Sequence, residues 1–170
     1  MIVIETERLI IRHMNLDDGA LILEVLNEPS FLRFIGDRGV RDMAGAQNYI
    51  RTAALDMYER LGFGFFLVES KADGCGMGFS GLAKRDYLDD VDIGFAFAPR
   101  YWHKGYASEA AAALLVYARD QLGLKRVVAT TRVDNDSSIK LLEGVGLRFE
   151  RRFMHADGDR ELNLFAIDFH

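Results

Sequence analysis

The stretch from Pro99 to Ala111, which reads PRYWHKGYASEAA, contains the residue types and spacing that best fit binding chemistry. It follows an apolar segment, passes through Gly105 and continues into an alanine-rich segment that favours helix. The first amides of a helix have no intrahelical partners and carry partial positive charge, so a phosphate can bind there. Near this glycine lie a small residue, Ala107, two residues that can carry positive charge, His103 and Lys104, and a hydroxyl residue, Ser108. The stretch is a candidate phosphate-binding turn, with a plain connection between strand and helix as the alternative.

Seven short segments are rich in β-branched or aromatic residues, and four others have the spacing of amphipathic helices. The predicted strands are 8–14, 63–69, 77–83, 91–98, 126–132, 147–155 and 161–169. The predicted helices are 15–28, 42–61, 108–122 and 137–143. Asn15 caps the first helix and Pro29 stops it, while Asp-Gly turns at 73–74 and 157–158 predict two hairpins. This order predicts a mixed α/β sheet in one continuous domain, residues 1–170.

The composition of the 170-residue chain excludes several classes of function. Its 26 acidic and 21 basic side chains give a net charge of −5, which argues against a nucleic-acid partner. The lone Cys75 allows neither an internal disulfide nor a cysteine-built zinc site, and His155 and His170 lack metal-ligand spacing, so we expect no metal. No segment approaches the roughly 18 apolar residues of a membrane span, and the first residues do not resemble a signal peptide. We expect a cytoplasmic protein without a membrane partner.

Residues 92–110, DIGFAFAPRYWHKGYASEA, resemble the acetyl-CoA signature of the GNAT acyltransferase superfamily. That signature is Q/R-x-x-G-x-G/A, and Gly105 and Ala107 match its fourth and sixth positions, whereas Trp102 departs from its first. With tryptophan at this position the sequence is similar to the ribosomal-protein serine/alanine N-acetyltransferases, which typically carry Trp-Gly-x-Gly-Tyr-Ala. Further segments similar to that subgroup are Thr6–Arg12, Asn27–Pro29 and Asn135–Leu147. The resemblance therefore covers nearly the whole chain.

The resemblance implies the GNAT fold, an α/β (α+β) architecture with a mixed, mostly antiparallel seven-stranded sheet flanked by about four helices. In this fold the strand that ends near Pro99 and the strand over 126–132 splay apart, and the pantetheine arm of the co-substrate acetyl-CoA lies between them. The arm would pair with the backbone of Phe95, Ala96 and Phe97. The pyrophosphate would bind the turn and the first helical residues, His103, Lys104, Gly105, Tyr106, Ala107 and Ser108.

The resemblance also implies roles at the reacting centre. An amide near Phe95 or Ala96 would face the thioester oxygen and stabilise the charge that develops on it. Asn135 would hold the cofactor arm or, alternatively, cap a helix. Ser138 would protonate the departing thiolate or be an ordinary first-turn serine. Many relatives place a tyrosine acid seven residues past this asparagine, and Leu142 excludes one here.

The identity of the general base is left open by the sequence. An α-amine has an ordinary pKa of about 7.7–8.0, so one carboxylate reached through water suffices to deprotonate it. The candidates are Asp92, Glu69, Asp86 and His13. An isolated acid on a strand is more often a solvated surface residue than a catalyst, so the residue types alone do not choose among them.

Together these features imply an N-acetyltransferase that moves an acetyl group from acetyl-CoA to a primary amine by direct attack in a ternary complex. The acceptor would be a peptide or protein N-terminus or a small amine, and the net charge is compatible with a cationic one. Residues 30–61, with Phe31 and Phe34, are expected to shape the acceptor cleft, and Trp102 to line it or the cofactor. The alternatives are a non-catalytic acyl-CoA-binding or regulatory module of the same fold, or another α/β protein with a phosphate ligand. Both a monomer and a homodimer are compatible with the sequence.

Overall fold

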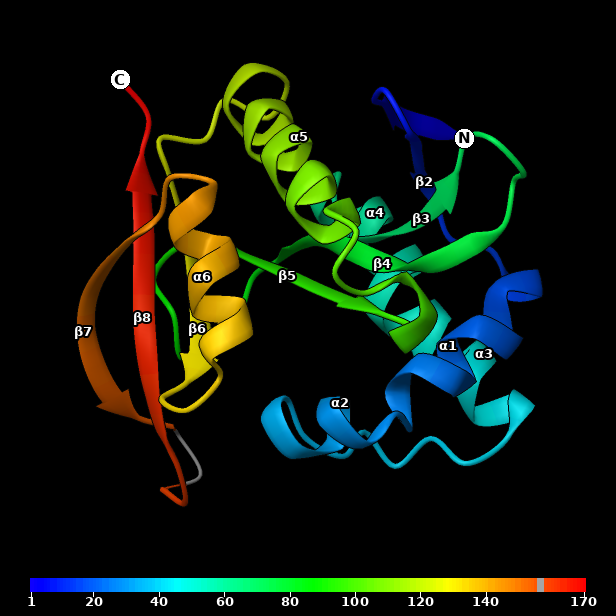
Figure 1. Cartoon of the computed structure of the whole chain (residues 1–170), viewed down its shortest axis with the longest axis horizontal. Helices are drawn as coiled ribbons and strands as arrows, with labels where there is room; N and C mark the ends of the chain where they lie inside the picture. Colours follow the sequence, from blue (N-terminus) through cyan, green and yellow to red (C-terminus); the bar gives the residue numbers. More distant parts are fainter. Residues whose placement is uncertain (156–157) are drawn as a thin grey trace.

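One mixed sheet organises the residues that the structure, a computed structural model, describes, which are 1–155 and 158–170 (Figure 1). Its eight strands in this part of the chain follow the spatial order β1-β2-β3-β4-β5-β6-β8-β7. Neighbouring strands pair antiparallel, except that β5 and β6 are parallel. The strands are β1 (Ile2–Glu5), β2 (Leu9–His13), β3 (Phe65–Ser70), β4 (Gly76–Ala83), β5 (Asp92–Phe97), β6 (Arg126–Arg132), β7 (Arg148–Met154) and β8 (Glu161–Asp168).

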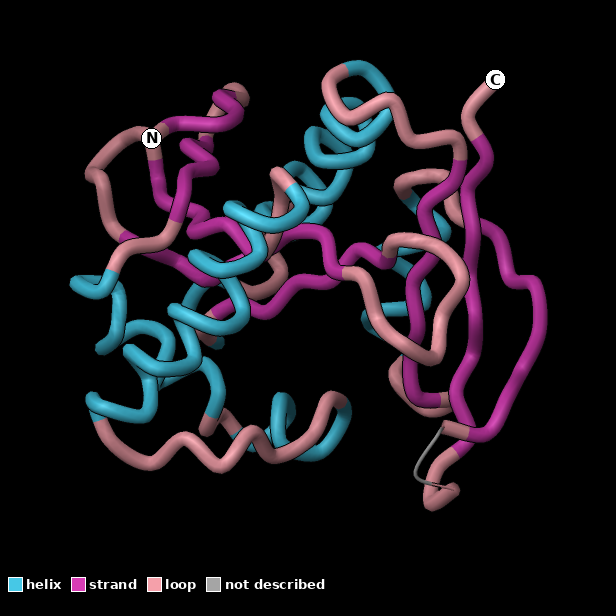
Figure 2. The backbone as a smooth tube through the Cα atoms, turned by 180° about the vertical axis from the view of Figure 1, so that it is seen from behind, coloured by secondary structure: helices cyan, strands magenta, loops and turns pink. Residues whose placement is uncertain are grey.

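Six α-helices among the described residues cover the two faces of this sheet. They are α1 (Gly19–Leu26), α2 (Pro29–Phe34), α3 (Met43–Ile50), α4 (Asp56–Leu61), α5 (Tyr106–Asp120) and α6 (Asp136–Gly144). Successive side chains of a strand point to opposite faces, so Phe66 packs with residues of α5 and α6, whereas Phe65 and Leu67 pack with residues of α1, α2 and α3. Figure 1 shows α5 and α6 on the near face, and Figure 2, from behind, shows the segment from α3 to α4 crossing the opposite face.

The predicted α/β class is confirmed, and each of the seven predicted strands is present near its expected bounds. The strand count of seven is wrong, because the short segment Ile2–Glu5 also pairs with β2. The described part of the chain has six α-helices in place of about four, because α2 is additional and the predicted helix over 42–61 is divided in two. Pro29, expected to stop a helix, lies in the first turn of α2, where its missing N–H leaves no hydrogen bond unmade. The predicted helix over 42–61 consists of α3 and α4, joined by a π-helical turn at Arg51–Leu55.

The predicted hairpin between β3 and β4 is confirmed. Gly74 in its turn has a φ of 73°, a left-handed conformation that glycine adopts without steric cost. In the second predicted Asp-Gly turn, before β8, Asp157 lies outside the described residues. β7 and β8 themselves pair antiparallel as expected of a hairpin.

The expected splay between β5 and β6 is also confirmed. The two strands share one bridge, between Asp92 and Val128, beside a hydrogen bond of 3.0 Å from the Val128 amide to the Val91 carbonyl. No further pairing joins them in the part of the chain that the structure describes. In contrast, every residue of β5 is paired with β4. β5 therefore has one paired edge and one edge that is open beyond Asp92.

Candidate active site

The open edge of β5 presents the backbone of Phe95 to the gap. Alternate residues of a strand direct their N–H and C=O groups to opposite neighbours. The Val91 carbonyl is directed to β6, and the Ala98 amide donates to Met77, on the β4 side, at 3.0 Å. By this alternation Phe95 faces the gap and Ala96 faces β4. Of the two amides expected near the reacting centre, the register thus brings that of Phe95 to the gap.

A narrow cavity of about 120 Å³ passes through the sheet where β5 and β6 part. Its wall combines residues of the two strands with residues from both layers of helices. The α6 layer contributes Asn135, Ser138 and Leu142, the strands contribute Asp92, Phe95 and Thr130, and the opposite layer contributes Phe31, Phe34 and Tyr49. The structure thus brings together residues that were predicted separately as cofactor-binding, catalytic and acceptor-binding.

Asp92 lies at the point where the two strands part. It is 6% exposed, and its Oδ1 is 3.5 Å from Nε of Arg85. Neither of these two buried atoms has a hydrogen-bond partner in the described part of the chain. Burial raises the pKa of Asp92 above its ordinary value, and the charge of Arg85 opposes this in part. A buried carboxylate with a raised pKa is a better proton acceptor near neutral pH than an ordinary surface aspartate.

Asn135 and Ser138 line the cavity at the start of α6. The Asn135 side chain accepts a hydrogen bond of 3.3 Å from the Ser138 amide, so the helix-capping alternative describes what this side chain does here. The cap fixes the first turn of the helix. It therefore also fixes the backbone that carries Ser138 at the edge of the cavity.

The candidate phosphate-binding turn precedes α5 on the exposed side of the molecule. Gly105 has a φ of 81° and is the residue before the first turn of α5, and His103 also has a positive φ, 60°. The Glu109 amide donates a hydrogen bond of 3.0 Å to the Gly105 carbonyl, and this is the first hydrogen bond of the helix. The amides of Tyr106, Ala107 and Ser108 precede this bond, so they lie at the helix end where an anion binds.

Arg8 holds this turn and was not singled out by the sequence. Its Nη1 donates to the Lys104 carbonyl at 2.9 Å, and its Nε donates to Glu109 at 2.7 Å. Glu109 also accepts from Thr6, at 2.5 Å. Burial acts against it, but the bonds from Thr6 and Arg8 keep the pKa of Glu109 below its ordinary value. The segment Thr6–Arg12 resembles the opening strand of the family. This resemblance alone does not indicate that Arg8 contacts residues about 100 positions further along the chain.

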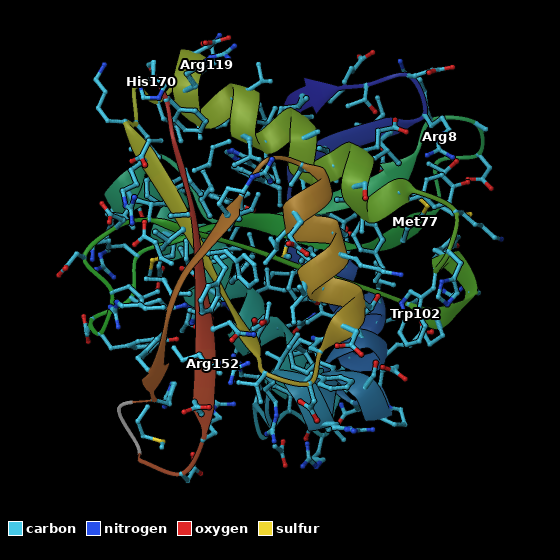
Figure 3. The ribbon with its side chains drawn as sticks, turned by 60° about the vertical axis from the view of Figure 1, so that its left-hand side comes forward. Arg8, Met77, Trp102, Arg119, Arg152 and His170 are labelled. Atoms are coloured by element: carbon cyan, nitrogen blue, oxygen red, sulfur yellow. The ribbon has the colours of Figure 1, made fainter. Side chains whose placement is uncertain are left out.

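Several predicted site residues lie away from the cavity. Glu69 forms an ion pair with Arg12 at 2.9 Å on β3, two strands from the gap. The His13 ring stacks on Tyr58 at 4.0 Å, and burial lowers its pKa. The Trp102 indole donates to the Phe97 carbonyl at 2.7 Å, so that carbonyl already has a partner. Figure 3 shows Trp102 at the right-hand edge, beyond the end of α5 that is opposite to Arg119.

A second, wider cavity of about 580 Å³ opens on the α2 side of the sheet. It shares with the narrow cavity the residues Phe34, Ile35, Arg38, Arg85, Asp92, Thr130 and Thr131. The two cavities thus meet at Asp92, one reaching toward α6 and the other toward α2. This arrangement can hold one reactant on each side of the sheet.

The described residues contain neither a membrane-spanning helix nor a cluster of metal ligands. None of the helices there has the length and apolar character that crossing a bilayer requires. Within the same residues, no group of three or more His, Cys, Asp or Glu side chains could hold a metal ion.

Comparisons with known proteins bear on the family of this chain. A family model described as "Acetyltransferase (GNAT) domain" matches residues 8–148. The uncharacterized N-acetyltransferase YnaD of Bacillus subtilis is 30% identical over 150 residues, which are 88% of this chain and 85% of that protein.

Solved structures share the fold at lower identity. The microcin C7 self-immunity acetyltransferase MccE, in complex with acetyl-CoA and AMP, has a TM-score of 0.83 at 16% identity and covers 96% of this chain and 94% of its own. An acetyltransferase from Salmonella typhimurium that modifies the N-terminal serine of ribosomal protein L7/L12 has a TM-score of 0.83 at 16% identity and covers 100% of both chains. This second protein belongs to the subgroup that the motif around Trp102 resembles. Since the family model spans most of the sequence and the fold agrees with it, the chain belongs to the GNAT acetyltransferase family.

Proposed function

We propose that this enzyme transfers an acetyl group from acetyl-CoA to a primary amine, either a small amine or the N-terminus of a peptide or protein. The observation that carries the proposal is the gap between β5 and β6, where Phe95, with its open backbone, and the buried Asp92 line one cavity. MccE, which has the same fold, is described in complex with acetyl-CoA, and this supports the choice of donor.

The residues of the gap fit an acyl-CoA donor. An extended arm can pair with the open edge of β5 as an added strand would, at Phe95. Its phosphates fit the amides between Gly105 and Ser108, beside Lys104. Asn135 and Ser138 close the other side of the gap. The donor supplies an acetyl thioester, in which a carbon–nitrogen bond replaces the carbon–sulfur bond when the amine attacks.

Three polar groups of the cavity then have roles in this transfer. Asp92, directly or through water, takes the proton that the amine loses. The Phe95 amide donates to the oxygen on which negative charge develops. Ser138 lines the same cavity, and its hydroxyl would pass a proton taken up from solvent to the departing thiolate. The amine approaches from the α2 side, past Phe31 and Phe34.

A thiol-release assay on N-terminal peptides, amino acids, polyamines and aminoglycosides tests the proposal, together with a titration of acetyl-CoA binding. We expect turnover with at least one amine. Binding of acetyl-CoA without turnover on any amine would favour the non-catalytic module. Absence of both binding and turnover would contradict both interpretations.

The turn before α5 gives a first specific prediction. Gly105→Val should raise the KM for acetyl-CoA about tenfold or more, because a β-branched residue is strained at a left-handed φ and the amides would shift. Its Cβ would also lie 3.2 Å from Nη2 of Arg8. The KM for the acceptor should change little.

Gly123→Val is the matched control for this substitution. Gly123 has a φ of 66° beyond the other end of α5, and a Cβ there meets nothing within 4 Å. Both variants should lose stability, but only Gly105→Val should weaken acetyl-CoA binding, as measured by steady-state kinetics at saturating acceptor. Equal effects on the two KM values in Gly105→Val would count against a phosphate site at this turn.

A further inference from the structure

The wide cavity on the α2 side has a charge that amine binding alone does not require. Five arginines line it against three aspartates, although the whole chain has a net charge of −5. The arginines come from segments distant in sequence and are Arg33, Arg38, Arg85, Arg132 and Arg160. One of the aspartates, Asp37, already forms an ion pair with Arg41 at 2.5 Å. Arg33 and Arg132 pair with Asp134, and Arg85 pairs with Asp92. The positive charge that remains for a ligand is therefore that of Arg38 and Arg160.

Buried polar atoms without partners gather in the same cavity. In the part of the chain that the structure describes, three buried side-chain nitrogen or oxygen atoms lack a hydrogen-bond partner, namely Nε of Arg85, Nε of Arg160 and Oδ1 of Asp92. All three residues line this cavity. Buried polar atoms normally have partners, and those left without one cost free energy until a ligand or water reaches them. Two of the three are donors on cations, which an anionic oxygen would satisfy.

Arg38 and Arg160 approach each other across Gly36. A Cβ at Gly36 would lie 3.5 Å from Nη1 of Arg38 and 3.7 Å from Nη1 of Arg160. Arg160 is held in place by a bond of 3.0 Å from Nη1 to the Ile35 carbonyl. Among the described residues neither arginine forms an ion pair with a carboxylate. Two unpaired guanidinium groups that face one space form a site for a carboxylate or a phosphate.

We propose that the acceptor is an amine that also carries a carboxylate or phosphate group, and that Arg38, Arg85 and Arg160 bind this anion. Arg85 links the anion site to the reacting centre, because its Nε lies 3.5 Å from Oδ1 of Asp92. With the anion held on the α2 side, the amine extends toward Asp92 and Phe95. The inference rests on the proposed function. It specifies an acceptor with an anionic group, whereas the net charge of the chain was compatible with a cationic acceptor.

Matched pairs of acceptors test this specificity. Alanine is compared with alaninamide, and O-phosphoethanolamine with ethanolamine, while spermidine represents cationic amines. We expect kcat/KM for the anionic member of at least one pair to exceed that of its neutral partner about tenfold or more, as a charge-assisted hydrogen bond provides. The pair that shows the preference identifies the anion as carboxylate or phosphate.

Arginine variants locate the preference in the cavity. Arg38→Gln and Arg160→Gln should each raise the acceptor KM about tenfold with kcat nearly unchanged, because they remove binding that ground and transition states share. Arg38 is exposed, so its replacement leaves the fold intact, and Arg38→Lys should restore part of the affinity. Arg119→Gln is the control, since Arg119 is at the far end of α5 and pairs only with Asp120 among the described residues (Figure 3).

The outcomes separate this inference from the proposed function. Turnover in which neutral or cationic amines match the anionic ones, or a preference that both glutamine variants retain, would overturn the anion site and leave the acetyltransferase standing. If no amine turns over, calorimetry with inorganic phosphate decides instead. Binding that weakens in Arg38→Gln and Arg160→Gln but not in Arg119→Gln would support the anion site, and absence of phosphate binding to the wild-type protein would overturn it.

Discussion

Replacing Asp92 with asparagine is expected to lower kcat at neutral pH by about 100-fold or more, within the range that a positioned general base contributes. The KM for acetyl-CoA should stay unchanged, because the donor contacts proposed above are made by other residues. Asparagine has the size of aspartate but cannot accept the proton of the amine. Steady-state kinetics with both substrates varied provides the measurement.

The pH dependence gives an independent check on the same residue. Burial raises the pKa of Asp92, partly offset by Arg85, and only the ionised form is the base. The wild-type kcat/KM should therefore fall as the pH drops through this raised pKa, which lies above the ordinary value of about 3.9. In Asp92→Asn this limb should be absent, and only the ionisation of the acceptor amine should remain.

Loss of activity in this variant should not come from unfolding. Because the pKa of Asp92 is raised in the folded state, that state binds the proton more tightly than the unfolded chain does. The stability that this group contributes is present at low pH and is lost as the pH rises through the folded pKa. A neutral asparagine does not carry the cost of ionisation, so Asp92→Asn should unfold no earlier than the wild type at neutral pH.

Glu69→Gln is the informative comparison, because the sequence alone offered Glu69 and Asp92 as equal candidates for the base. Glu69 pairs with Arg12 at 2.9 Å and lines neither cavity. We expect its replacement to leave kcat within about threefold of the wild type, because Glu69 lies on β3, two strands from the gap. A loss in Glu69→Gln as large as that in Asp92→Asn would contradict the assignment of Asp92.

Gly81→Ala is expected to lower the free energy of unfolding by about 1–3 kcal/mol or more, as overpacking does. A Cβ at Gly81 would lie 2.2 Å from the Gly64 carbonyl oxygen and 2.6 Å from Cα of Phe65. Both atoms belong to backbone, so no flexible side chain can move aside. β4 would have to separate from β3 at the centre of the sheet.

Urea denaturation measures this loss, and Gly144→Ala supplies the control. Gly144 ends α6, and a Cβ there meets nothing within 4 Å. Since alanine reduces the entropy of the unfolded chain, Gly144→Ala should stabilise the protein by about 0.4–1 kcal/mol. If Gly81→Ala proves as stable as the wild type, the close approach of β3 and β4 does not restrict this position.

The periodicity of the sequence was sufficient to predict most of the sheet, because apolar and aromatic residues repeat with the spacing that each strand requires. It missed β1 because four residues at a chain end carry too little pattern to be distinguished from a tail. The first helix does end before Pro29, at Leu26, but the sequence did not predict that Pro29 also begins α2, because proline is common both after one helix and in the first turn of another. The π-helical turn at Arg51–Leu55 left no trace in the spacing.

The candidate site was predictable where its residues follow one another along the chain. The turn at Gly105 and the segment from Asn135 to Ser138 are local motifs, and the structure places them as expected of a strand-to-helix turn and a helix start. The arginine-lined cavity could not be found this way. Arg38, Arg85 and Arg160 are spread over more than 100 residues, and only the pairing order of the strands brings them to one place.

The single bridge between β5 and β6 also bears on how the protein avoids self-association. An open strand edge is a template for pairing with another chain, and proteins usually shield such edges at the rim of a sheet. Here the open edge of β5 lies inside the sheet, with Phe31 and Phe34 from α2 on one side and Leu142 from α6 on the other. A rigid sheet of a second molecule cannot enter so narrow a space, whereas a slender ligand can. The fold thus keeps unsatisfied backbone for a small partner without offering an aggregation-prone edge to a large one.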